Sequence, residues 1–437
     1  TEAVGQVTGL PGRHLDAWLM PPSVCRGLFA RAAVAAELSV VEGTLEEPNE
    51  GLSYTSCDHP GDLRPVAEAL DLPLVAVVSC RGLDTETVHL PHLPQGVDAV
   101  LLDELSDPES GPRLRRLVEL ASGLPVLGAI EDLPEVRAAL GQLPRDRHLP
   151  EDLIEALARS FLKQADGMAI RELARRRRFP PTDELAGFAG PGRRRFRVAY
   201  AQDEAFGRYF PDTLEALEAL GAELVEFSPL RDEALPAGVG LVMIGCGFPD
   251  HYADELAANL SMMAALGEHV CRGRRIYSEG GGTAYLGRRM IIAGRSYRGA
   301  CILPFDAELR ADPPPPAPVS RRLLHDSWLG PRGTVVRGYQ SPRWRLIPGI
   351  DIESFGCPTC LGALSAEGDW FYHHHAVGSL LHLHFGALPE VVAAFAGPHR
   401  PSLRRPTARG LAERQVDHAA GRDPELEAHD PLAGPDL

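Results

Sequence analysis

Lysine is almost absent from this sequence. Lys163 is the only one, so nearly all positive charge is arginine, and a mechanism that requires a lysine has a single candidate. No apolar run approaches the roughly 18–20 residues that a membrane span needs, and no secretory signal is visible. A basic excess is missing too, since the formal net charge is −16, which argues against a nucleic-acid binder. We therefore expect a cytoplasmic protein with neither a membrane nor a nucleic acid as its partner.

A disulfide framework is also missing. Eight cysteines are scattered at positions 25, 57, 80, 246, 271, 301, 357 and 360. Spread through 437 residues, they are typical of reduced cytosolic thiols. The chain is 44% hydrophobic and 24% charged, which is ordinary for a globular protein, and its length suggests two domains or three.

The first half alternates apolar runs with helical patterns. Buried parallel strands are expected at 38–43, 74–79, 98–103 and 125–130, with a helix at 113–122 among the helical segments between them. This βαβ pattern predicts a doubly wound sheet. We place a first domain at 1–174.

A segment rich in Arg, Pro and Gly follows, and we interpret 175–195 as a linker. The pattern then restarts. Strands are expected at 196–201, 222–227, 240–245 and just before Glu279, and helices at 211–221 and 255–270. This is a second α/β domain, placed at 196–397. Beyond it, 398–437 has few large apolar residues and is expected to be a mobile tail.

The stretch "RIYSEGGGTAYLG" (275–287) ends an apolar run and enters a helical pattern through glycines. Strand, sharp turn and helix present a nucleophile at the edge of a parallel sheet. No Ser, Cys or Thr stands at this turn, where Glu279 is followed by Gly280, Gly281 and Gly282. The turn has the expected pattern without the nucleophile.

Several long stretches resemble the cobyrinic acid a,c-diamide synthase family. In the second half these are 203–236, 247–263, 275–287 and "LLHLHF" (380–385), and in the first half "TGLPGRHLDAWLM" (8–20) through "VVEG" (40–43). The resemblance implies a P-loop NTPase-like domain followed by a class I glutamine amidotransferase-like domain. It also implies an ATP-dependent activity that converts two carboxylates of a corrin precursor to amides with ammonia from glutamine.

The same resemblance implies a cysteine in the turn and a histidine in the "HLHF" stretch. Their positions here are Gly280 and His382, with Glu279 beside the turn. Glycine offers no atom for attack, and Cys271 lies nine residues earlier, before the strand. We therefore expect no glutaminase activity, with His382 and Glu279 as remnants of the site.

The nucleotide side departs from the family as well. No G-x-x-x-x-G-K-[ST] phosphate loop occurs in the sequence, and the resemblance places that loop upstream of Thr1. Glu42 matches an acidic residue next to the family's nucleotide site, but the loop after it differs from the family's glycine-rich version. We expect neither ATP nor Mg²⁺ as a cofactor.

Two further patterns are candidate ligand sites. Cys357 and Cys360 form a C-x-x-C pair, which is half of a zinc site or two ordinary cysteines near a turn. His373, His374 and His375 form a triplet whose first and third members would share one face of a strand. Imidazoles can bind the metal of a tetrapyrrole, while a solvent-facing turn is the simpler alternative.

These observations predict a catalytically inactive relative of the family that keeps a surface for a metallated tetrapyrrole or for a partner protein. Two alternatives stay open: a non-catalytic subunit of an amidoligase that works with another chain, and a metal-binding protein built on Cys357, Cys360 and the histidine triplet. Because a sheet without its first strand has an open edge, we expect a homodimer or a complex with a related amidoligase subunit.

Overall fold

The computed structural model describes residues 5, 7–34, 36–44, 61–81, 93, 95–142, 149–176, 196–348, 361–363 and 368–396. Before the 177–195 gap the helices are α2 (Pro22–Ala33), α3 (Leu63–Leu70), α4 (Gly111–Ser122), α5 (Pro134–Gln142), α6 (Glu151–Gln164) and α7 (Gly167–Arg176). The strands there are β1 (Leu74–Ser79), β2 (Val97–Leu105) and β3 (Val126–Glu131). They form a parallel sheet in the order β1-β2-β3.

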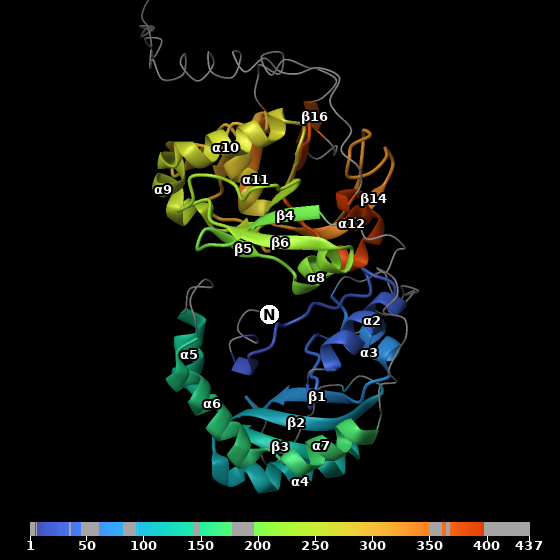
Figure 1. Cartoon of the computed structure of the whole chain (residues 1–437). Coiled ribbons are helices and arrows are strands. Elements are labelled where there is room, and N and C mark those ends of the chain that lie inside the picture. Colours follow the sequence, from blue (N-terminus) through green and yellow to red (C-terminus); the bar gives the residue numbers. More distant parts are fainter. Residues whose placement is uncertain are drawn as a thin grey trace, which may run out of the picture.

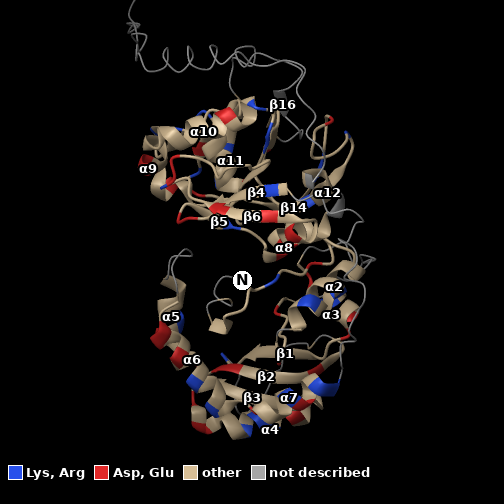
Figure 2. Ribbon diagram, in the orientation of Figure 1, with Lys and Arg blue, Asp and Glu red and all other residues tan. Residues whose placement is uncertain are grey.

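This first sheet lies apart from the larger one, and α2 and α3 lie between the two layers (Figure 1). Leucine and valine side chains of β2, β3 and α4 form its core, as expected for parallel strands covered by helices. Acidic and basic residues are mixed on α4, α6 and α7 (Figure 2). The strands expected at 74–79, 98–103 and 125–130 are therefore present, each within about two residues.

Two sequence predictions of elements are wrong. Residues 38–43 are not a strand, and Leu38 and Val40 are 46% and 82% exposed, so their apolar character does not reflect burial. The helix expected at 255–270 is two helices, α9 (Ala253–Ala258) and α10 (Leu260–Cys271). Asn259 separates them, and its side chain caps α10 by accepting a hydrogen bond from the backbone N–H of Met262 at 3.1 Å.

Beyond the gap, a seven-stranded sheet has the order β16-β17-β18-β9-β7-β4-β6. Its strands are β4 (Phe196–Ala201), β6 (Ala222–Phe227), β7 (Leu241–Ile244), β9 (Arg275–Glu279), β16 (Leu361–Ala363), β17 (Trp370–His373) and β18 (Ala376–Ser379). The central strands β7 and β9 are buried along their whole length. Such strands need helices on both faces, and the chain supplies them.

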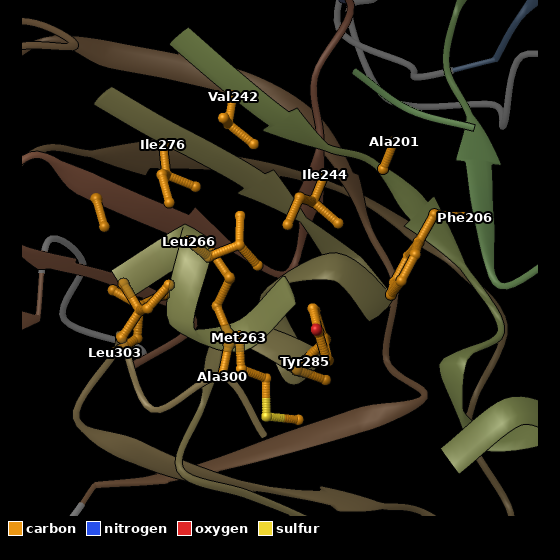
Figure 3. Close-up of a cluster of buried hydrophobic side chains, with 14 of the residues drawn as sticks. Ala201, Phe206, Val242, Ile244, Met263, Leu266, Ile276, Tyr285, Ala300 and Leu303 are labelled. Carbon is orange, nitrogen blue, oxygen red and sulfur yellow. The ribbon is translucent and has the colours of Figure 1, made fainter. Parts of the chain in front are cut away.

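One face packs against α10 and α11 (Gly280–Leu286), and the other against α8 (Pro211–Ala219) and α12 (Pro389–Ala396). Val242, Ile244 and Ile276 of the strands meet Met263 and Leu266 of α10 beside Tyr285 of α11 (Figure 3).

Shorter sheets flank this core. They contain β5 (Phe206–Arg208) with β8 (Cys246–Gly247), β10 (Arg289–Ile292), β11 (Arg295–Arg298), β12 (Phe305–Leu309) and β15 (Trp344–Pro348), and β13 (Ala317–Arg322), β14 (Val335–Gln340) and β19 (Leu381–His382). Among the residues that the structure describes, no helix combines the length and the apolar character of a membrane span.

The N-terminal segment docks directly on the larger layer. Arg13 forms ion pairs with Asp212 and Glu215 of α8, and Asp16 accepts a hydrogen bond from the hydroxyl of Tyr339 in β14. The guanidinium of Arg337 donates to the carbonyl of Trp18 at 2.6 Å. Residues of the first half are thus held against the part of the chain that contains the 275–287 turn.

Candidate active site

The turn after β9 has the geometry that the sequence predicted. β9 ends at Glu279, and α11 begins at once with Gly280. Gly280 has φ +50°. This left-handed backbone conformation is energetically unfavourable for any residue that carries a side chain. The hydroxyls of Ser278 and Thr283 are 2.9 Å apart below the turn, and both side chains are fully buried. Gly280 stands where a nucleophile would be presented, and these hydroxyls do not reach its outer side.

A cysteine from the neighbouring strand occupies that outer side. β7 and β9 are parallel, and their register pairs Ile244 with Ser278. Two residues further along both strands, Cys246 and Gly280 lie side by side beyond the strand ends. A Cβ atom built on Gly280 would be 2.8 Å from the Cys246 sulfur. The space that a side chain at position 280 would enter is therefore taken by the Cys246 thiol.

His382 lies next to this thiol. It ends β19, which follows β18, and β18 pairs with β9 on the other side, so that Ser379 is opposite Glu279. The Nδ1 atom of His382 is 3.5 Å from the Cys246 sulfur and 2.7 Å from Oε2 of Glu279. The carboxyl ends of β7, β9 and β18 thus bring a thiol, a carboxylate and an imidazole together, at the edge where α/β sheets place their ligands.

Glu279 is held firmly through its other oxygen. Its side chain is 6% exposed. Oε1 accepts hydrogen bonds from the hydroxyl of Tyr277 at 2.8 Å and from the backbone N–H of Leu383 at 3.1 Å. Burial, with the nearby carboxylate of Glu279, raises the pKa of Tyr277 well above its usual range, so this hydroxyl stays a donor. Oε2 is left to face His382.

The electrostatics of the site favour a protonated imidazole. Burial opposes the charge on His382, but the charges and hydrogen bonds of Cys246 and Glu279 outweigh burial and raise the pKa of His382 to about 10. The side chain of His382 keeps 22% exposure, and Cys246 is half-buried. Both side chains are therefore partly accessible to solvent.

Other predicted site residues lie elsewhere. His373 ends β17, and His374 and His375 form the turn to β18, so of the two alternatives for the triplet a turn is present and a continuous strand is not. This turn is at the amino end of β18, opposite to the Glu279 end. Nδ1 of His373 is 2.8 Å from the carbonyl oxygen of Ile302. The triplet is therefore not part of the cysteine site, and its binding of a tetrapyrrole stays a prediction.

Glu42 is exposed in an irregular segment, and the site does not include it. Cys357 and Cys360 lie outside the described residues. Cys271 ends α10 before the amino end of β9, as the sequence suggested. The residue that sequence reasoning missed is Cys246, in "MIGCGFPD". A signal for it existed, because Cys246 directly follows a predicted strand that could lie beside the strand of the turn.

Comparisons with known proteins agree with this architecture. Residues 197–387 match the CobB/CobQ-like glutamine amidotransferase domain. The chain is 29% identical to the cobyrinate a,c-diamide synthase of Syntrophotalea carbinolica, over 88% of this chain and 86% of that protein. It is 30% identical to the hydrogenobyrinate a,c-diamide synthase of Streptomyces coelicolor, over 90% of this chain and 88% of that protein.

Among solved structures, a glutamine amidotransferase from Thermotoga maritima aligns with a TM-score of 0.29 and 10% identity. The alignment covers 52% of this chain and 86% of that one.

Proposed function

Because this chain belongs to the cobyrinate a,c-diamide synthase family, we propose that it hydrolyses the side-chain amide of glutamine with Cys246 as the nucleophile. The released ammonia amidates side-chain carboxylates of a cobyrinate-like corrin precursor. One observation carries this proposal: the Cys246 sulfur fills the space beside Gly280 and is 3.5 Å from Nδ1 of His382. The chain lacks a nucleophile on the turn but has one facing the turn.

The chemistry follows from the three side chains. With the proton of the Cys246 thiol held on His382, the thiolate attacks the amide carbon of glutamine. His382 then protonates the leaving nitrogen, ammonia departs, and a thioester remains on the sulfur. Water attacks the thioester, glutamate and the thiolate are released, and the proton that the water gives up returns to His382. Glu279 stabilises the charged imidazole throughout, through its 2.7 Å contact with Nδ1 of His382.

The proposal assigns carboxylate activation to residues outside this sequence. The 437 residues contain no phosphate loop, and the β1–β3 sheet is, in this proposal, the remainder of a P-loop-type domain. A related amidoligase subunit would bind ATP with its own phosphate loop. The exposure of Val75 and Val77 on β1, 40% and 64%, supports a partner at this strand. A monodisperse monomer by light scattering, with no co-purifying protein from the native host, would contradict this part.

Glutamate release by the purified full chain, in the presence of a reductant and a chelator, tests the nucleophile. We expect release above a heat-killed control, and loss of that excess in Cys246→Ala. Cys271→Ser is the matched control, because it removes a thiol near the opposite end of β9, and it should keep full activity. An electrophilic glutamine analogue should label Cys246 in peptide mapping.

The prediction of an inactive chain is the opposite outcome of the same experiment. No glutamate release and no labelling at Cys246 would support inactivity and overturn the proposal. The double variant Cys246→Gly/Gly280→Cys then becomes informative, because it puts the thiol back on the turn and clears the space. Activity of that variant alone would show a site that has lost only its nucleophile.

A further inference from the structure

The donor atoms of the cysteine site converge on one point. A relay through histidine uses its two ring nitrogens, one for the nucleophile and one for the carboxylate. Here the Cys246 sulfur and Oε2 of Glu279 both face the same nitrogen, Nδ1 of His382, at 3.5 and 2.7 Å. The three donor atoms all lie within 4.8 Å of one another. Three donor atoms this close together could hold a metal ion.

The distances suit a tetrahedral ion. Zinc lies about 2.3 Å from thiolate sulfur and about 2.0–2.2 Å from imidazole nitrogen or carboxylate oxygen. In a tetrahedron this places sulfur and nitrogen about 3.6 Å apart, and nitrogen and oxygen about 3.4 Å apart. The sulfur–nitrogen distance of 3.5 Å already has the required length. The nitrogen–oxygen contact of 2.7 Å is a hydrogen bond that would have to open by about 0.7 Å.

The surroundings orient the ligands. Oε1 of Glu279 is occupied by the Tyr277 hydroxyl and the Leu383 N–H, which leaves Oε2 turned toward the site. The ring of Phe210 stacks on His382, with centroids 4.1 Å apart. Outer contacts of this kind fix the geometry of metal-binding side chains. Because Cys246 and His382 are only partly buried, an ion has a path in from solvent.

We propose that Cys246, His382 and Glu279 bind one Zn²⁺ ion through Sγ, Nδ1 and Oε2, with the fourth position open to solvent. Binding releases the proton of the thiol–imidazole pair to solvent, because a metal ligand must be deprotonated. Thiolate and imidazole ligands favour zinc over magnesium or calcium. The site does not depend on glutamine hydrolysis, but it uses the same sulfur. A bound ion would occupy the sulfur electron pair that attacks glutamine. Zinc would therefore keep Cys246 unreactive until a chelator removes the ion.

Zinc binding is tested first without any variant. The full chain is stripped with a chelator and treated with iodoacetamide, with and without added Zn²⁺. We expect Zn²⁺ to slow alkylation of Cys246 at least about 10-fold and chelator to reverse this, while alkylation of Cys271 in the same sample is unchanged. Equal rates at Cys246 with and without the metal would overturn the proposal, whether or not the chain hydrolyses glutamine.

Cobalt substitution then identifies the ligands. Co²⁺ alone, added to the stripped chain, should give a thiolate-to-metal charge-transfer band and the visible spectrum of a four-coordinate ion. Cys246→Ser should lose the charge-transfer band. Glu279→Gln should keep the band but need at least about 10-fold more metal. Cys271→Ser and Cys357→Ser/Cys360→Ser are the controls, and loss of the band in either one would place the metal elsewhere.

Failure of this proposal is distinguishable from failure of glutamine hydrolysis, because metal binding is measured without glutamine and hydrolysis is measured with chelator.

Discussion

Phe210 and His382 stack with ring centroids 4.1 Å apart and planes inclined by 20°. Phe210 also stacks with His14, at 5.5 Å. It directly precedes α8, whose Asp212 and Glu215 pair with Arg13. The imidazole of the cysteine site is therefore in contact, through one phenyl ring, with the segment that docks the first half of the chain.

Replacement of Phe210 by leucine should loosen His382. An aromatic pair contributes about 0.5–1.5 kcal/mol beyond its buried area, so alkylation of Cys246 in the chelated chain should slow about 2- to 10-fold. Phe161→Leu, at a 38% exposed position on α6, is the matched control. An unchanged rate in Phe210→Leu would mean that Glu279 alone fixes the imidazole.

A cysteine at position 280 should form a disulfide with Cys246. A Cβ atom on Gly280 would be 3.6 Å from the Cβ of Cys246, within the usual 3.5–4.5 Å for bridged cysteines. We expect oxidised Gly280→Cys to lose two thiols, with the 246–280 link found by peptide mapping. Cys246→Ala/Gly280→Cys is the control and should lose none. Persistence of both thiols under oxidation would contradict the side-by-side placement.

Replacement of Arg13 should lower the free energy of unfolding more than replacement of Arg31. The Asp212 side chain is fully buried, and that of Arg13 is 13% exposed. Removing one partner of such a pair costs about 3–5 kcal/mol, and we expect the lower end for Arg13→Met because His384 lies 3.5 Å from Asp212. Within the described part of the chain, Arg31 pairs with the 30% exposed Glu215, so Arg31→Met should cost less than about 1 kcal/mol. Urea unfolding of both variants measures the difference, and equal costs would contradict it.

Acid should weaken the folded state through His14. Burial, with the nearby His384, lowers its pKa from 6.5 to about 4. Between these two pH values the unfolded chain binds a proton at His14 more readily than the folded chain does. The free energy of unfolding is therefore highest above pH 6.5 and decreases as the pH falls toward 4. The loss is about 2 kcal/mol at pH 5. Urea midpoints at pH 7.5 and 5 should differ less in His14→Gln than in the parent, and equal differences would assign the acid sensitivity to other groups.

Short-range patterns predicted much of the larger layer. β4 and β6 begin and end where alternating apolar residues placed them, and the Glu279–Gly280 turn was predicted from its own sequence. The strand at 38–43 was wrong, because Leu38 and Val40 are apolar without being buried. Within α9 and α10, one capping residue, Asn259, outweighed a continuous helical pattern. Local composition does not reveal which apolar residues become buried against other parts of the chain.

Cys246 escaped prediction for a different reason. The missing nucleophile was sought along the turn itself and in Cys271, the nearest cysteine before it. Position 246 is 34 residues from Gly280 and becomes its neighbour only through the parallel register of β7 and β9. The paired carboxylate and imidazole of Glu279 and His382 were named from the resemblance, and the structure brings them together at 2.7 Å.

The crowding between positions 246 and 280 also constrains the order in which their residues can have changed. With a cysteine on the turn, a second cysteine at 246 would place a sulfur 2.8 Å from its Cβ, and the two would bond or clash. A lineage that exchanged one thiol for the other therefore passed through an ancestor with neither, or through one in which both were locked in a disulfide. Either ancestor would have had no free thiol at this site, so it could not have hydrolysed glutamine through a thiol at position 246 or 280.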